Sequence, residues 1–155
     1  MTEKELVRTI NLFYEGHMSK EAKAALKLVL KKLTDREQKK VLSKVTFLEY
    51  KDGREKDSKE DGPLGMLLQM CRPSAPKHSF DYLMLINLSA HKDRDDLPYT
   101  IAHEMAHFLL GHGKEHCDED EHIRHDQEAD QWCKEHGFLP FLNPDLLNLV
   151  EVKDV

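Results

Sequence analysis

The residues best suited to chemistry lie in residues 100–109, which read TIAHEMAHFL. Residues four apart share one face of a helix, so His103 and His107 can present two imidazole nitrogens to one metal ion. Two histidines from one helical turn are a common way to hold zinc. Glu104 follows the first histidine, and in this pattern it is the general base that acts on the zinc-bound water. The pattern therefore predicts a zinc site that can hydrolyse a peptide bond.

The residues around this pattern favour a buried helix. No proline interrupts it, and a buried helix carrying two histidines and a glutamate without a purpose would leave costly unpaired polar groups. The competing interpretation is an amphipathic helix whose histidines and glutamate face solvent. The positions between and beside the three polar residues are all uncharged: Ile101, Ala102, Met105, Ala106, Phe108 and Leu109.

A catalytic zinc site needs a third protein ligand and one open position for water. The metzincin pattern would place a glycine and a histidine at positions 110 and 113, where this chain has Leu110 and Gly113. That class is therefore excluded. His112 is one residue away from that spacing, and as a residue at a helix end it would also suit the helix dipole.

A second acidic segment, residues 126–133, reads DQEADQWC. With the AHExxH helix before it, the stretch from residue 82 to residue 138 resembles the ImmA/IrrE-type group of soluble gluzincin zinc peptidases, and minimal one-domain gluzincins look similar. The group has a strand, the AHExxH helix and a second helix with an acidic ligand in a motif like ExxA(D/N)xxA. Ala129, Asp130 and Cys133 match the later positions of this motif.

The resemblance places the third zinc ligand at Asp126, where the family usually has glutamate. Helical spacing agrees, because positions 126, 129, 130 and 133 share one face. Glu128 points to another side of the helix but has the more usual side chain, so it remains the alternative ligand, and a histidine (His112, His122 or His125) is a further one. Asp130 is predicted to lie behind the ligands and to accept the outer ring N–H of a ligating histidine.

Two features of the cleft stay open. The donor that would stabilise an oxyanion beside zinc is not selected by the sequence, and Tyr99, His112 and His125 are the candidates. The resemblance also implies that the strand of residues 82–88 forms the rim of the cleft and pairs with an extended substrate.

The elements that must position these residues can be read from local signals. A helix is predicted over Leu97–Leu110, with Pro98 in its first turn and Gly111 and Gly113 as its stop. A second helix is predicted over residues 119–136 and ends at Gly137. A short helix is predicted near residues 146–150.

The rest of the chain divides into helices and strands. Residues 1–44 read as helices, and Val45–Tyr50, residues 64–71 and residues 82–88 read as strands of a small sheet with antiparallel character. Residues 51–63 are predicted to form a loop. The expected fold is α+β: a zincin-like domain (45–155) whose three-to-four-stranded sheet packs on the two ligand helices, preceded by an N-terminal helical segment (1–44) that is part of the domain or a cover.

Composition limits the function classes. The net charge is −6, which argues against a nucleic-acid partner, although a zinc nuclease remains a minor alternative. Three scattered cysteines do not resemble a disulfide framework, and no apolar run spans a bilayer, so a cytoplasmic protein without a membrane partner is expected.

The preferred hypothesis is a zinc metalloendopeptidase with one zinc per chain and a protein or peptide substrate. If the resemblance holds, that substrate could be a regulatory protein. The alternative is a zinc-binding regulatory or interaction module with little or no hydrolysis. The oligomeric state is not predicted.

Overall fold

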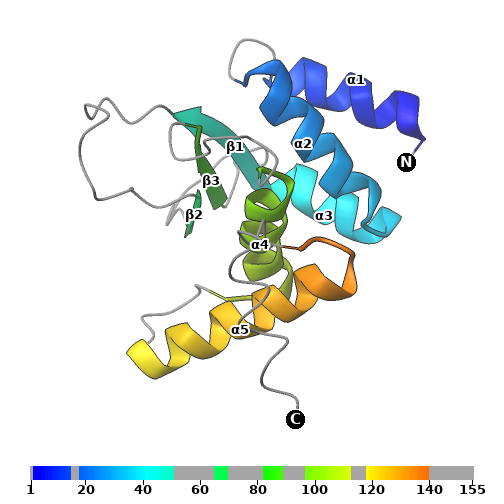
Figure 1. Ribbon diagram of the computed structural model, residues 1–155. Coiled ribbons are helices and arrows are strands. Elements are labelled where there is room, and N and C mark those ends of the chain that lie inside the picture. The colour runs from blue at the N-terminus through cyan, green and yellow to red at the C-terminus, as the bar shows by residue number, and fades with distance from the viewer. Residues whose placement is uncertain are drawn as a thin grey trace, which may run out of the picture.

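The computed structural model describes residues 2–14, 18–50, 65–69, 82–88, 97–112 and 118–139. Over these residues the chain is α+β, with five helices and a three-stranded mixed sheet. The sheet and the three N-terminal helices lie on different sides of α4, and α5 packs along it (Figure 1). The elements, in chain order, are α1 (Glu3–Tyr14), α2 (Lys20–Lys31), α3 (Asp35–Lys44), β1 (Val45–Tyr50), β2 (Gly65–Gln69), β3 (Tyr82–Asn87), α4 (Leu97–Leu110) and α5 (Glu119–Glu135).

Two of the N-terminal helices start where their capping residues predict. The Ser19 hydroxyl accepts a hydrogen bond from the Ala22 backbone N–H at the start of α2. At the start of α3, Thr34 and Glu37 form a capping box in which each side chain accepts a hydrogen bond from the other residue's backbone N–H. These bonds satisfy backbone donors that a helix leaves free at its first turn.

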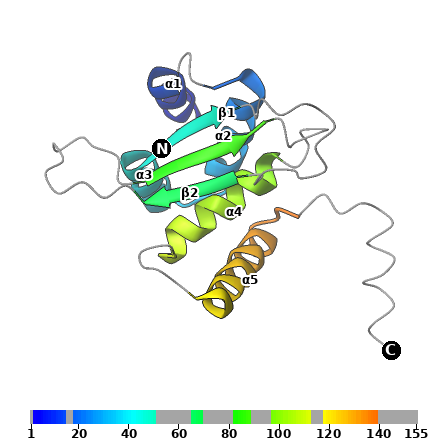
Figure 2. The ribbon, with the colours of Figure 1, turned by 90° about the vertical axis from the view of Figure 1, so that its left-hand side faces the viewer.

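The sheet has the strand order β1-β3-β2, and Figure 2 shows the three strands side by side above α4. The predicted antiparallel pairing is confirmed for β2 and β3 but wrong for β1 and β3, which run parallel. A parallel pair needs a long connection between its strands. Here residues 51–81 separate β1 from β3 and contribute β2 on the far side of β3.

The order of the strands also corrects the prediction that residues 82–88 form the rim of the cleft and pair with a substrate. β3 is hydrogen-bonded to a strand on each side, so it has no edge free to pair with a substrate. In the part of the chain that the structure describes, β2 lies at an edge of the sheet and contacts α4 more extensively than β3 does. An extended peptide could add only to such an unpaired edge.

Helix α4 is at the centre of the core. Ile101, Ala102, Met105 and Ala106 are fully buried, as the uncharged residues around the histidines predicted. α2 packs against α4, and its buried side chains belong to the same hydrophobic cluster as those of α4, β1 and β3. The N-terminal helices and the sheet thus share one core over the described residues.

Some predictions fall outside the described residues, among them the loop at 51–63 and the short helix at 146–150. None of the helices in the described part of the chain combines the length and apolar composition needed to cross a bilayer.

Candidate metal centre

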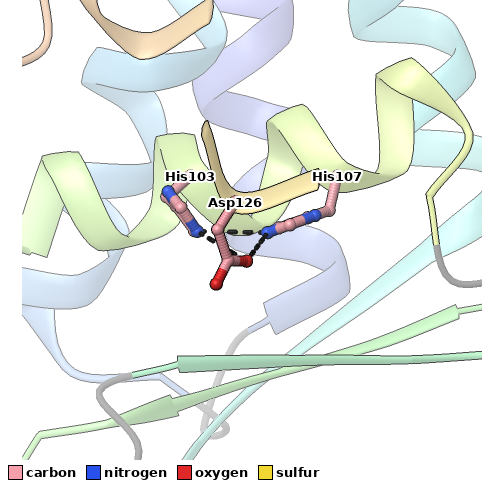
Figure 3. A group of neighbouring side chains, drawn as sticks. All are labelled: His103, His107 and Asp126. Atoms are coloured by element: carbon pink, nitrogen blue, oxygen red, sulfur yellow. Dashed lines mark hydrogen bonds and ion pairs between the residues drawn. The ribbon is translucent and has the colours of Figure 1, made fainter. Parts of the chain in front are cut away.

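Three side chains from two helices meet at one point. His103 and His107 come from successive turns of α4, and Asp126 comes from α5, which packs beside it. Figure 3 shows the two rings and the carboxylate pointing toward one another. The Nε2 atoms of the two histidines are 3.1 Å apart, and Oδ1 of Asp126 lies 3.3 Å from Nε2 of His107 and 3.9 Å from Nε2 of His103. These three residues form a group that could hold a metal ion.

The spacing of these atoms fits a small cation. Ligands about 2.0–2.1 Å from a tetrahedral ion lie roughly 3.3 Å from one another, close to the three separations seen here. Two imidazole nitrogens and a carboxylate oxygen are donors that divalent transition metals prefer. The predicted ligand Asp126 is thus brought to the histidines. Glu128, the alternative, is not in the group, and no other set of described residues offers three such donors.

The outer nitrogen of His103 faces Asp130. Its Nδ1 lies 2.9 Å from Oδ1 of Asp130, although the two are not aligned as a hydrogen bond. The Tyr99 hydroxyl donates a hydrogen bond to the same carboxylate oxygen. Burial and this bond to Asp130 raise the pKa of Tyr99, so the hydroxyl keeps its proton. Asp130 therefore lies behind His103, where it was predicted, and Tyr99 holds the carboxylate there.

The outer nitrogen of His107 faces another histidine. Nδ1 of His107 and Nδ1 of His112 are 3.0 Å apart, and Nε2 of His112 lies 2.9 Å from Oε2 of Glu128. The ring of His125 stacks on His112 with centroids 4.1 Å apart. Glu128 thus contacts the metal group only through His112. Neither Tyr99 nor His112 is left free as an oxyanion donor.

Glu104 lies beside the group and is partly buried. Burial and the charge of Asp126 together raise its pKa to about 7, against the opposing effect of a hydrogen bond from the Leu67 backbone. The carboxylate is therefore positioned between the metal group on α4 and strand β2. A cation bound beside it would favour its ionised form.

Burial also sets the protonation state of His107. Burial and the neighbouring His103 and His112 lower its pKa to about 4, against the attraction of Asp126. The ring is therefore neutral at ordinary pH, as a metal ligand must be.

A cleft of about 410 Å³ opens beside the three candidate ligands. One wall is strand β2, with Gly65, Met66 and Leu67, and the other carries His122 and His125 from α5. Glu104 also lines it, so its side chain is accessible from the cleft. A second hollow of about 300 Å³, between Gly65 and Asp130, lies on the Tyr99 side of His103 and Glu104.

No protein-family model matches the chain, and no curated protein or solved structure is significantly similar to it. The arrangement of the side chains must therefore carry the functional argument.

The structure adds one residue that the sequence reading did not single out. A Cβ atom on Gly65 would lie 2.9 Å from Cγ2 of Thr100 and 3.0 Å from Cγ of Glu104. Glycine at this position therefore allows β2 to approach α4 and Glu104 closely. The signal was present, because a glycine inside a strand often marks a close approach.

Proposed function

We propose that the protein is a zinc-dependent metallopeptidase that cleaves a peptide bond in a protein or peptide substrate. The observation that carries the proposal is the position of Glu104. Its partly buried carboxylate lines the same cleft as His103, His107 and Asp126, and it lies next to an edge strand. A site that only stores a metal needs neither an acid beside the ligands nor an open cleft.

The donor set supports zinc as the ion. His103, His107 and Asp126 supply three protein ligands, the number typical of catalytic zinc sites, which keep a fourth position open. When bound, zinc supplies Lewis acidity and makes water a good nucleophile near neutral pH.

The chain's own residues then have separate tasks. Glu104 takes the proton from the attacking water and gives it to the leaving amine. The β2 edge, residues Gly65–Gln69, holds the substrate backbone in an extended form through main-chain hydrogen bonds. His125 lines the cleft, with its ring stacked on His112 and its Nε2 3.9 Å from Oε1 of Glu121, and it is the donor we assign to the carbonyl oxygen.

Zinc binding and hydrolysis can be tested separately with Glu104→Gln. We expect about one zinc per chain in the purified protein, and peptide cleavage detected by mass spectrometry with a broad peptide library. Glu104→Gln should keep the zinc and lose cleavage, and Glu135→Gln, an exposed change on α5, should keep both. A wild-type chain that takes up no zinc would refute the proposal.

One observation favours a second candidate, a zinc-binding interaction module with little hydrolysis. Two of the three expected oxyanion donors, Tyr99 and His112, are already bonded to other side chains. A zinc-loaded wild-type chain that cleaves nothing in the library would select this candidate.

A further inference from the structure

The turn that ends α4 brings His112 back onto the metal group. Gly111 has a φ of 80°, its N–H donates to the Phe108 carbonyl at 3.3 Å, and the His112 N–H donates to the His107 carbonyl at 2.9 Å. These bonds form a Schellman motif, in which a left-handed residue reverses the chain at a helix end. The bond from its backbone to His107 keeps His112 beside that residue, and its side chain is only 7% exposed.

The protons in this cluster have one consistent arrangement. If His107 binds a metal through Nε2, the atom that faces His103 and Asp126, its proton must be on Nδ1. That proton needs an acceptor, and Nδ1 of His112 is 3.0 Å away. A neutral His112 that accepts at Nδ1 carries its own proton on Nε2, which lies 2.9 Å from the Glu128 carboxylate. The proton position in each hydrogen bond thus determines which atom donates in the next one.

We propose that His112 is a positioning residue for the metal ligand His107, and that Glu128 selects the His112 tautomer that accepts the His107 proton. The proposal rests on the proposed metal site and deepens it. α5 then contributes to the centre twice: Asp126 binds the ion directly, and Glu128 acts through two imidazole rings. Outer partners of this kind fix the orientation of a ligating ring and raise its basicity.

The first test compares zinc affinities measured with a competing chelator. His112→Leu removes the acceptor and should weaken zinc binding about 10- to 100-fold, the usual loss for such a partner. His112→Asn places an amide oxygen near the position of Nδ1 and should recover most of that loss. His136→Leu, at the end of α5, is the matched control and should bind zinc as the wild type does. If His112 only filled space, leucine would do as well as asparagine.

The second test reads the tautomer directly. In ¹⁵N-labelled, zinc-loaded protein, long-range ¹H–¹⁵N spectra should show His112 protonated at Nε2 and His107 protonated at Nδ1. Glu128→Ala should mix the two His112 tautomers. The cobalt-substituted protein should also change its visible spectrum in His112→Leu and keep it in His136→Leu.

The outcomes separate this inference from peptidase activity. Weaker zinc binding in His112→Leu supports the inference even if the wild type cleaves no peptide. Zinc affinity in His112→Leu equal to that of the wild type overturns it, as does a His112 ring protonated at Nδ1. A wild-type chain that binds no zinc overturns both proposals.

Discussion

Replacing Gly65 with alanine should disturb the cleft at the point where β2 approaches α4. The added Cβ would lie 2.9 Å from Cγ2 of Thr100 and 3.0 Å from Cγ of Glu104. Carbon atoms in contact are normally about 3.5–4.0 Å apart, so the strand or the helix must move by roughly 0.5–1 Å. Forcing a methyl group into a packed site costs about 1–3 kcal/mol. In a chain of this size, that loss lowers the melting temperature by about 2–12 °C.

Gly137→Ala separates the loss of stability from the effect on the site. Gly137 ends α5 with a φ of 78°, and a Cβ there meets nothing within 4 Å. Alanine in this left-handed conformation costs roughly 1–2 kcal/mol without a clash. Both variants should therefore melt earlier than the wild type in a circular-dichroism scan.

Of the two variants, only Gly65→Ala should change the reaction, because Gly65 lies against Glu104 and Gly137 does not. A displacement of about 1 Å at a catalytic group can cost a factor of about 100 in rate. On any peptide that the wild type cleaves, we expect kcat/KM to fall 10- to 100-fold in Gly65→Ala and to stay unchanged in Gly137→Ala. A Gly65→Ala protein with wild-type stability and wild-type rate would refute the packing argument.

Three further predictions concern separate parts of the chain. Asp126→Asn should lower zinc affinity by more than about 100-fold, which exceeds the loss expected from an outer partner. Glu128→Gln keeps an acceptor for His112 and should change zinc affinity only a few-fold. If a chelator titration gave the reverse order, Glu128 would be the ligand. Thr34→Ala removes the cap of α3 and should cost about 1 kcal/mol in urea unfolding without affecting zinc binding, and an unchanged midpoint would count against the cap. Cys133 is buried, and burial raises the pKa of its thiol to about 12. In a variant that lacks the other two cysteines, this thiol should therefore react with a disulfide reagent at pH 8 only after the protein unfolds.

The features predicted well from the sequence are those set by residues three or four apart. The bounds of α4 were predicted as Leu97–Leu110, and the structure has the same bounds. The resemblance placed the ligand at Asp126 rather than Glu128 and helical periodicity agreed with it, and the structure brings Asp126 to the histidines while Glu128 contacts His112. In each case the deciding information lies within one or two turns of a helix.

The features predicted poorly depend on contacts between distant segments. The β-prone residues of β1 and the short apolar run of β3 indicate strands, but they do not show that the two pair in parallel with β2 on the far side. Gly111 was recognised as the stop of α4. The positive φ of Gly111 turns the chain so that His112 returns to the metal group. The contact of His112 with Glu128 could not be predicted, because Glu128 comes from the separate helix α5.

One interface joins the two helices that hold the candidate ligands. α5 makes its main contact with α4 and packs against it through Ala129, Trp132 and Cys133. A cation bound by His103 and His107 on one helix and Asp126 on the other would cross-link the pair. An ion at about 1,000 times its dissociation constant would add roughly 4 kcal/mol to the docked state. Amide hydrogen exchange should therefore slow more in α5 than in α2 when zinc is added, which would make the last helix of the centre a local folding unit controlled by metal supply.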